Sequence, residues 1–190
     1  LWLQPETIDS ATQVLRDAGL NPNQPMVAMS PGAAWSTKQW PIARFINLAE
    51  QLLSQGVQVV ISGGPDEATL CNLIVGAVPE VAFIPAPIPL WAGIISHCTA
   101  MVANDSGPMH IARALQVPTL ALFGSTNPHQ FDFSEHAAIS TNAPCSPCHF
   151  YGRSFCPRVH FRCMKDLSLD AAWTALLPLL NADKKPTAFG

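Results

Sequence analysis

The stretch AMVANDSGPMHIARALQVPTLALFG, residues 100–124, decides the fold of this chain. Its two apolar runs, 100–103 and 118–124, enclose a segment whose apolar residues recur at helical spacing. Continuous apolar strands are typical of parallel sheets that are buried on both faces. The stretch therefore predicts a strand, a helix and a second parallel strand, with a polar turn at 104–110 where the first strand ends.

The same alternation extends over most of the 190 residues. Apolar runs predict further strands at 26–30, 57–62 and 81–84, and helical spacing predicts helices at 5–20, 41–56, 66–78, 89–98 and 168–180. This alternation predicts an α/β fold with a Rossmann-like, doubly wound parallel sheet. We expect one such domain over 26–182, after a linker helix and turn at 1–25 and before a tail at 183–190.

Residues 125–165 interrupt the pattern, and we call them the cysteine-rich segment. They are rich in Pro, His, Cys and Phe and show little periodicity, which predicts a long functional loop or a loosely structured excursion. Order returns with the last helix, for which Ser168 is the predicted N-cap. Pro178 is predicted to kink the final turn of that helix.

Hydrophobic residues make up 48% of the sequence and charged residues 12%, with a net charge of −3. The low net charge excludes a general nucleic-acid binder. No apolar run approaches the roughly 18 residues of a membrane helix, and the first residues lack the basic start of a signal peptide. We therefore expect a soluble, cytoplasmic protein whose apolar excess covers a face that a partner or another domain buries.

The polar turn after residues 100–103 contains an acid, a hydroxyl, a glycine and a histidine. Asp105 or Ser106 can cap the following helix, and Gly107 lets a ligand approach the backbone. The N–H groups at a helix start favour an anion such as phosphate, and His110 can add a donor. The alternatives are a capped helix without a ligand and a hydrolytic relay, although no nucleophile-elbow pattern surrounds the serine.

Two further loops follow predicted strands, SPGAAWSTKQWP at 30–41 and SGGPDE at 62–67. The carboxyl ends of parallel strands meet at one edge of the sheet, where ligands bind in open α/β folds. Lys38 is either a phosphate contact or a solvated surface lysine, and the acids either cap a helix or hold ribose hydroxyls. The candidate binding residues are Ser30, Gly32, Ser36, Thr37 and Lys38 in the first loop, and Gly64, Asp66 and Glu67 in the second.

Four of the six cysteines lie in the cysteine-rich segment, at Cys145, Cys148, Cys156 and Cys163. The first two have the spacing of zinc ligands, and histidines lie nearby at 149 and 160. The last two are separated by six residues rather than the usual two to four. The alternatives to a zinc site are a cluster of reduced thiols and a disulfide formed during purification. We favour these alternatives over zinc and expect that the protein requires no cofactor.

Together these motifs resemble those of a known family. SPGA with K-x-WP, VVISGGPDE, NDSGPMHIARAL and P-x-LALFGSTNP stand in the order found in the C-terminal domain of the ADP-heptose:lipopolysaccharide heptosyltransferases. PCSPC, FCP and RCM resemble the cysteine-bearing loop of many members, and the resemblance covers nearly the whole chain. It implies a B-type glycosyltransferase, in which two Rossmann-like halves face each other across a cleft and the C-terminal half binds the nucleotide sugar.

The resemblance also implies roles for the matching residues. Lys38 would contact the diphosphate of the donor and stabilise it as the leaving group. The backbone at Asp105, Ser106 and Gly107 would cradle the phosphates, and Asp105 would also reach the heptose, with His110 beside the same group.

The loop after the second strand would serve the nucleoside, because the resemblance places Asp66 or Glu67 near the adenosine ribose. The sequence departs from the family pattern in two places. Ala33 and Ala34 stand where some members carry hydroxyl residues. The stretch VAFIPAPIPLW lacks the Gly-Lys/Thr-Ser pattern common before the third helix, so side-chain contacts to phosphate and nucleobase differ at these points.

The implied reaction is inverting transfer of heptose from ADP-heptose to the lipopolysaccharide inner core, with an acid of the N-terminal half as base. Because 25 residues precede the first strand, we expect that half to be missing and the chain to bind the donor without transferring it. The alternatives are a B-type transferase domain that uses another nucleotide sugar and a non-catalytic module that binds a metal or a partner.

The cysteine-rich segment also concentrates positive charge, because residues 136–165 contain no acid. The cations that matter are Arg153, Arg158, Arg162 and Lys165. They form either a solvated basic face or a contact with anionic lipopolysaccharide core or acidic lipids, since local positive charge attracts anionic partners. The second reading implies peripheral contact with the cytoplasmic face of the inner membrane.

Overall fold

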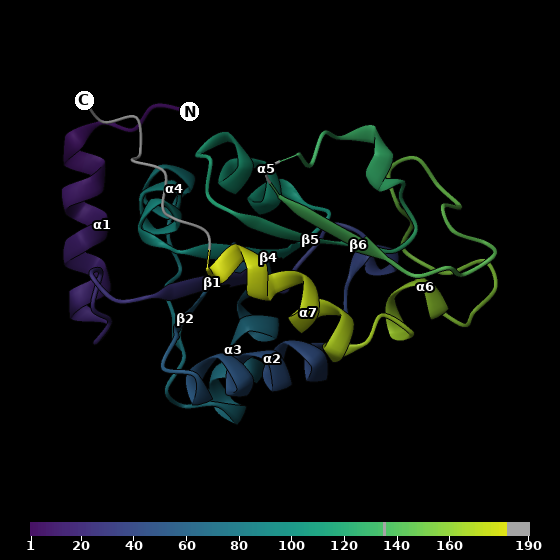
Figure 1. Cartoon of the computed structure of the whole chain (residues 1–190), viewed down its shortest axis with the longest axis horizontal. Coiled ribbons are helices and arrows are strands. Elements are labelled where there is room, and N and C mark those ends of the chain that lie inside the picture. Colours follow the sequence, from purple (N-terminus) through teal and green to yellow (C-terminus); the bar gives the residue numbers. More distant parts are fainter. Residues whose placement is uncertain (135, 182–190) are drawn as a thin grey trace.

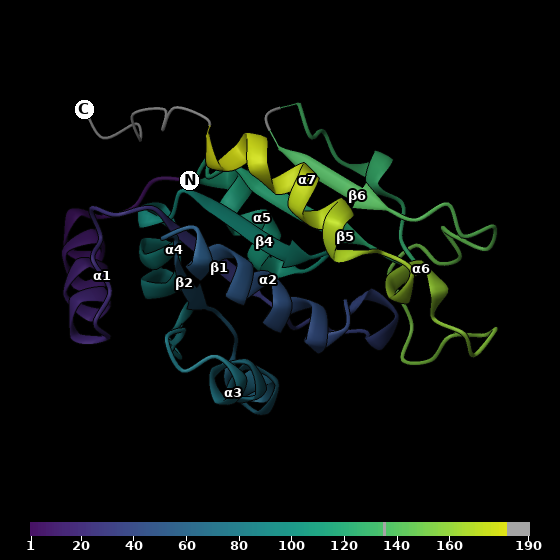
Figure 2. The ribbon, with the colours of Figure 1, turned by 60° about the horizontal axis from the view of Figure 1, so that its bottom comes forward.

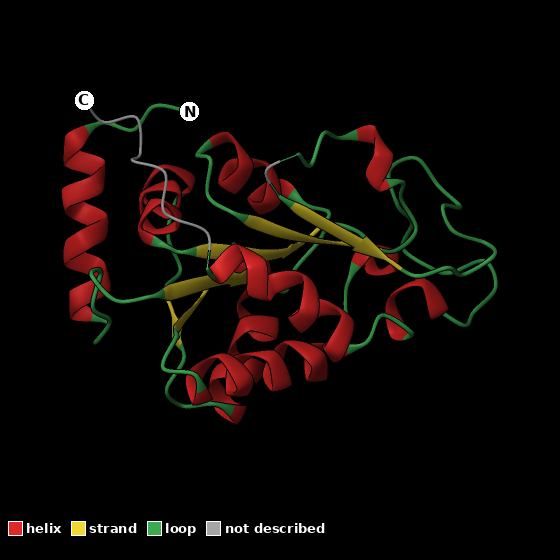
Figure 3. Ribbon diagram, viewed as in Figure 1, coloured by secondary structure: helices red, strands yellow, loops and turns green. Residues whose placement is uncertain are grey.

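The computed structural model describes residues 1–134 and 136–181. In this part of the chain six strands form one sheet between two layers of helices (Figures 1 and 3). The strands are β1 (Met26–Ser30), β2 (Gln58–Ile61), β3 (Ala82–Phe83), β4 (Ala100–Asn104), β5 (Thr119–Phe123) and β6 (Ala137–Ser140). The α-helices are α1 (Pro5–Asp17), α2 (Ile42–Ser54), α3 (Ala68–Ala77), α4 (Ile88–His97), α5 (Gly107–Ala114), α6 (Arg162–Lys165) and α7 (Leu169–Leu180). Short 3-10 helices, η1 (Ser36–Lys38), η2 (Pro65–Glu67) and η3 (Pro128–Gln130), lie in the loops that follow β1, β2 and β5.

The strand order is β3-β2-β1-β4-β5-β6, and every neighbouring pair is parallel. The first strand, β1, therefore lies in the middle of the sheet. The next two strands are added outward to β3, and the chain then returns to the centre and adds β4, β5 and β6 on the other side. Between β1 and β4 the direction of winding reverses, so the loops that follow these strands diverge and open a crevice. The predicted Rossmann-like, doubly wound parallel sheet is confirmed.

Each central strand divides its side chains between two apolar cores, one on each face of the sheet. Val27 and Met29 face α2, α3 and α7, whereas Met26 and Ala28 face α1, α4 and α5. Figure 2 shows α2 and α7 side by side over the first face. Because both faces are covered, every residue of β1, β4 and β5 is buried, as their continuous apolar runs predict.

Helix α1 packs closely against α4. Its residues Ala11 and Leu15 are fully buried in the core of that face. A Cβ atom at Gly93 of α4 would lie 2.9 Å from the Ala11 Cβ, so the glycine allows the two helices to approach. The predicted tail at 183–190 lies outside the described residues.

The cysteine-rich segment contains more regular structure than its sequence suggests. β6 pairs with β5 at the edge of the sheet, and η3 and α6 lie on either side of it along the chain. The expectation of an irregular segment is wrong for β6. This strand has the sequence AAIS and is at least partly exposed throughout, so it lacks the apolar run by which the other strands are identified. Backbone pairing with β5 stabilises β6 as a strand, although its own residues show no strand pattern.

The last helix follows the sequence closely. The Ser168 hydroxyl accepts a hydrogen bond from the Ala171 N–H at 3.1 Å, which confirms the predicted N-cap. The helix continues past Pro178 to Leu180.

Candidate functional site

The candidate site lies at the carboxyl ends of β1 and β4, where the winding of the sheet reverses. Asn104, the last residue of β4, is buried and holds the loop after β1 in place. Its side-chain N–H donates to the Pro31 carbonyl at 2.8 Å, and its side-chain oxygen accepts from the Trp40 N–H at 3.0 Å. One amide therefore fixes both ends of the loop that carries Lys38.

Lys38 and Asp105 form an ion pair at the centre of the site. Their Nζ and Oδ2 atoms are 2.8 Å apart, and the two side chains are 13% and 7% exposed. The Thr126 hydroxyl donates a further hydrogen bond to the same carboxylate oxygen at 2.7 Å. Because the loops after β1, β4 and β5 each contribute one of these groups, the pair is positioned by three strands at once.

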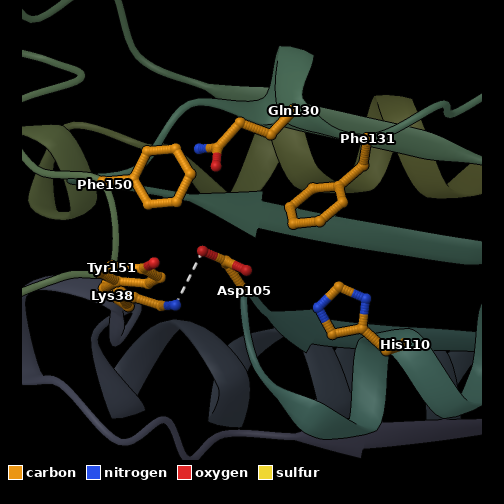
Figure 4. A pocket seen from close by; sticks show the side chains of 7 residues that line it. All are labelled: Lys38, Asp105, His110, Gln130, Phe131, Phe150 and Tyr151. Atoms are coloured by element: carbon orange, nitrogen blue, oxygen red, sulfur yellow. Dashed lines mark ion pairs between the residues drawn. The ribbon is translucent and has the colours of Figure 1, made fainter.

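This pair lies in a pocket of about 590 Å³, which we call the charged pocket (Figure 4). Figure 4 shows Asp105 near the middle, with Lys38 on one side and His110 on the other. The pocket is lined by Lys38, Asp105, His110, Gln130, Phe131, Phe150 and Tyr151. Its walls thus combine charged, hydrogen-bonding and aromatic groups, as sites for polar small molecules do.

His110 lies in the first turns of α5 and is accessible to solvent. Its ring meets the Phe131 ring edge to face, with centroids 5.0 Å apart. Burial lowers the pKa of His110 below its ordinary value, although the nearby Asp105 carboxylate acts in the opposite direction. The imidazole is therefore neutral near pH 7, where it can both donate and accept a hydrogen bond.

The start of α5 is open to a ligand. Ser106 occupies the N-cap position, but its hydroxyl donates to the Asn104 carbonyl at 3.2 Å and makes no capping bond. Asp105 does not cap the helix either, because its carboxylate binds Lys38 and Thr126. A Cβ atom at Gly107 would meet nothing within 4 Å, so space remains in front of the helix. The predicted side-chain cap is wrong, and its absence leaves the positive end of the helix for an anion.

A second pocket, of about 200 Å³, lies on the other side of the same helix start and is largely apolar. We call it the apolar pocket. It is lined by Gly63, Gly64, Glu67, Ala86, Ile88, Trp91, Gly107, Pro108 and Ile111. Gly107 and Pro108 line this pocket while Asp105 and His110 line the charged one, so the start of α5 separates the two.

Glu67 is the polar group of the apolar pocket. Its carboxylate accepts a hydrogen bond from the Gly64 N–H at 3.0 Å. It also lies directly over Gly32, where a Cβ atom would overlap the carboxylate. Gly32 therefore serves the site by leaving room for Glu67. Asp66, the other predicted acid, is exposed and lies outside both pockets.

Thr37 and Ser36 are engaged within the protein. The Thr37 hydroxyl donates to the Arg153 carbonyl at 2.9 Å and accepts from the Arg153 N–H at 2.8 Å and from the Ser125 hydroxyl at 2.9 Å. The Ser36 hydroxyl donates to the Ser154 carbonyl. A threonine hydroxyl has one donor and two acceptor positions, so that of Thr37 is fully used. Both residues attach the cysteine-rich segment to the site.

The remaining predicted residue, Ser30, lies at the end of β1 and is fully buried. The structure thus sorts the predicted residues into three groups. Lys38, Asp105 and His110 line the charged pocket; Gly64, Glu67 and Gly107 line the apolar pocket; and Ser30, Gly32, Ser36, Thr37, Asp66 and Ser106 line neither.

Several residues of the site were not among the candidates. Asn104 and Thr126 fix the geometry, and Gln130, Phe131, Phe150 and Tyr151 complete the charged pocket. The position of Asn104 and Thr126 after predicted strands is a signal that points to them. The aromatic residues come from the cysteine-rich segment, whose lack of periodicity gives no indication of which side chains turn inward.

The six cysteines are free thiols. Cys145 and His160 approach each other, with Sγ and Nε2 3.7 Å apart. Within residues 1–134 and 136–181, however, no three His, Cys, Asp or Glu side chains converge to hold a metal ion. The zinc hypothesis therefore gains no support from the described part of the chain.

One basic residue of the cysteine-rich segment, Arg162, pairs with an acid that lies just beyond the segment. Arg162 Nε lies 2.8 Å from Asp166 Oδ2, one helical turn further on. Among the helices of the described residues, none combines the length and apolar character needed to span a bilayer.

The chain is similar in sequence to known proteins. Lipopolysaccharide heptosyltransferase 2 of Salmonella typhimurium is 32% identical over 142 residues, which are 67% of this chain and 39% of that protein. Lipopolysaccharide heptosyltransferase 1 of Pseudomonas aeruginosa is 32% identical over 135 residues, 69% of this chain and 38% of that protein. The chain thus spans about two fifths of the length of these curated relatives.

Solved structures show the same fold. ADP-heptose lps heptosyltransferase II of Escherichia coli superposes with a TM-score of 0.75 at 25% identity, over 95% of this chain and 53% of that one. A family 9 glycosyl transferase from Veillonella parvula superposes with a TM-score of 0.78 at 23% identity and the same coverage. The family model described as glycosyltransferase family 9 (heptosyltransferase) matches residues 3–156. The matched residues include β4 and α5, and the start of α5 lies between the Lys38–Asp105 pair and the apolar pocket. Because the family model covers most of the chain, the chain belongs to glycosyltransferase family 9, the heptosyltransferase family.

Proposed function

We propose that this chain binds the nucleotide sugar ADP-heptose and supplies the donor-binding half of a heptosyltransferase that acts on the lipopolysaccharide inner core. The observation that carries the proposal is the pair of pockets on either side of the α5 start. A nucleotide sugar has an apolar base at one end, a polyhydroxylated sugar at the other and a diphosphate between them. The apolar pocket, the helix start and the charged pocket follow in the same order.

Each part of the donor has a chemically suitable partner. The base would pack in the apolar pocket against Trp91 and Ile111, and the Glu67 carboxylate would accept hydrogen bonds from the ribose hydroxyls. The diphosphate would bind the backbone at Gly107 and the positive end of α5. Lys38 would contact the same phosphates from the charged pocket.

The sugar would then lie beside Asp105 and His110 in the charged pocket. Its hydroxyls can donate to the carboxylate and share a hydrogen bond with the neutral imidazole. Lys38, which pairs with Asp105, would exchange part of that contact for the diphosphate. The charge that develops on the leaving diphosphate during transfer would be stabilised by the lysine and by the helix dipole.

Transfer also needs a general base that activates the acceptor hydroxyl. We propose that the base belongs to the part of the relatives that this chain does not match, since the chain spans about two fifths of their length. The 190-residue chain alone should therefore bind the donor without turnover. Measurable heptose transfer by the purified chain would contradict this.

The acceptor is anionic, and the cysteine-rich segment offers cations to it. Arg153 and Arg158 lie in a stretch without acids, and Arg158 is exposed. We propose that they face the lipopolysaccharide core at the cytoplasmic surface of the inner membrane. Reversing the charge of Arg158 should weaken sedimentation of the chain with vesicles that contain anionic lipid, and unchanged binding would remove the membrane contact from the proposal.

Calorimetry with ADP, UDP and GDP tests the central proposal. We expect selective binding of ADP that Lys38→Met weakens by at least tenfold, because the substitution keeps the side-chain stem but removes the charge. Lys165→Met, at an exposed lysine outside both pockets, is the matched control and should leave ADP affinity unchanged. A preference for UDP or GDP would indicate another nucleotide sugar, and no binding of any of the three would leave a non-catalytic module.

A further inference from the structure

The charged pocket has a wall that the family assignment does not explain. Phe150 and Tyr151, from the cysteine-rich segment, line it together with the Lys38–Asp105 pair. Figure 4 shows the two rings on the Lys38 side of Asp105, opposite His110 and Phe131. Their centroids are 4.7 Å apart and their planes meet at 81°.

These rings are exposed although they are apolar. Phe150 is 64% and Tyr151 68% accessible to solvent. Large aromatic groups that remain in water lose the free energy that their burial would provide. Exposed rings at the rim of a pocket therefore point to a surface that a bound molecule covers.

The segment that carries the rings is held firmly against the site. His149 Nδ1 accepts hydrogen bonds from the N–H groups of Tyr151 and Gly152 at 3.1 and 3.0 Å, which closes a tight turn. Directly after the turn, Arg153 exchanges two hydrogen bonds with the Thr37 hydroxyl. The turn is thus anchored to the residue that precedes Lys38.

Gly152 brings the turn into contact with Lys38 itself. It has a φ of +100°, and a Cβ atom there would lie 2.7 Å from Lys38 Cδ and 2.8 Å from Trp35 Cδ1. Only glycine fits a backbone that adopts this conformation so close to a side chain. The aromatic wall and the lysine are therefore placed relative to each other by direct packing.

We infer that Phe150 and Tyr151 recognise the sugar of the nucleotide sugar and determine which sugar the site accepts. This inference rests on the proposed function. A pyranose ring presents apolar C–H faces and a rim of hydroxyls, which match aromatic faces on one side and the Gln130, Asp105 and His110 groups on the others. The sugar is favoured as the occupant because the rings share one pocket with the ion pair, whereas the nucleoside has the apolar pocket.

The test compares the affinities of the 190-residue chain for ADP and for ADP-heptose by calorimetry. The variants are Phe150→Ala and Tyr151→Ala. Phe155→Ala is the matched control, because Phe155 belongs to the same segment and is also 64% exposed but does not line the charged pocket. Circular dichroism melting curves check that all three variants fold.

We expect ADP affinity to stay within twofold in every variant. The preference for ADP-heptose over ADP should fall about five- to tenfold in Phe150→Ala and Tyr151→Ala and remain unchanged in Phe155→Ala. Equal affinity of the unaltered chain for both ligands, an unchanged preference in the two variants, or an equal loss of ADP binding would each overturn the inference. Failure of the unaltered chain to bind either ligand would instead overturn the proposed function, and the inference with it.

Discussion

Asn104 and Asp105 are adjacent in the sequence at the end of β4 and have different roles: Asn104 holds a neighbouring loop, and Asp105 lines the charged pocket. The Asn104 amide points into the protein and holds the loop after β1 by its backbone. The Asp105 carboxylate points into the charged pocket and holds the lysine carried by that loop. Because Asn104 is the last residue of β4 and Asp105 begins the turn that follows it, one dipeptide can both build the site and take part in it.

The Lys38–Asp105 pair should be sensitive to the loss of either partner. Lys38→Met would leave a mostly buried carboxylate with the Thr126 hydroxyl as its remaining contact among those described. We expect the free energy of unfolding to fall by about 2–4 kcal/mol, measured by urea denaturation. In the double variant Lys38→Met/Asp105→Asn, which removes the unpaired charge, about half of that loss should be recovered. Strictly additive effects would show that the pair is not coupled.

Gly32 and Gly64 offer a matched comparison, because both lie beside the Glu67 carboxylate. Gly32→Ala would drive a Cβ into the Glu67 carboxylate, whereas Gly64→Ala would meet nothing within 4 Å. Because the overlapping atoms are the end of a flexible side chain, Glu67 can move aside and give up its bond to the Gly64 N–H. We therefore expect Gly32→Ala to reduce the free energy of unfolding by about 0.5–1.5 kcal/mol. Gly64→Ala should change it by less than about 0.5 kcal/mol. Equal melting temperatures for the two variants would refute the idea that Gly32 exists to accommodate Glu67.

At the scale of elements, the cysteine-rich segment forms part of the site, because it is hydrogen-bonded to the loop after β1 and lines the charged pocket. It is joined to the loop after β1 through Thr37, and to Gly124, directly after β5, through the Ser146 hydroxyl, which donates to the Gly124 carbonyl. The segment thus closes over the carboxyl ends of two strands. Its order depends on these bonds.

Removing the Thr37 hydroxyl should loosen this connection. Thr37→Val would leave the partly buried Arg153 N–H and the buried Ser125 hydroxyl without their present partner. We expect a loss of about 1–3 kcal/mol in stability and faster hydrogen exchange at the Arg153 amide. Thr37→Ser keeps the hydroxyl and should retain most of the protection. Unchanged exchange in Thr37→Val would mean that the segment is held by other contacts.

The sequence predicts the elements far better than their long-range contacts. The central strands are apolar because both faces of the sheet are covered, and helix periodicity follows from the same burial, so both can be read locally. The position of Lys38 and Asp105 at strand ends likewise predicts that they meet. Thr37 and Arg153 are separated by 116 residues, and nothing near either residue indicates its partner. The aromatic wall was missed for that reason.

At the scale of the whole molecule, the six cysteines report on how the chain unfolds. Cys148 is exposed, whereas Cys71, Cys98 and Cys163 are buried, and burial raises the pKa of Cys71 to about 12 and that of Cys163 to about 11. Only the thiolate reacts with an alkylating reagent. Desolvation also raises the pKa of Cys148, so its exposure is what favours its reaction. We expect iodoacetamide to label Cys148 before the three buried thiols at pH 8, and these only as urea unfolds the chain, followed by mass spectrometry.

Two results would contradict this picture. Labelling of Cys71 at urea concentrations below the unfolding transition would show that the two cores do not unfold as one unit. Protection of Cys148 together with a stoichiometric metal in the purified chain would show that the cysteines of this segment are ligands rather than free thiols.

The open start of α5, between its two pockets, also bears on inhibitor design. A compound that joins a flat apolar ring to a polyol through a short linker rich in hydrogen-bond acceptors would occupy both pockets, and the affinities of its two ends would reinforce each other. On the proposed mode of binding, the central contact would be made by main-chain groups around Gly107, which no side-chain substitution removes. Escape from such a compound is therefore expected to arise at the pocket walls, where the substitutions that exclude the inhibitor would also impair binding of the proposed donor.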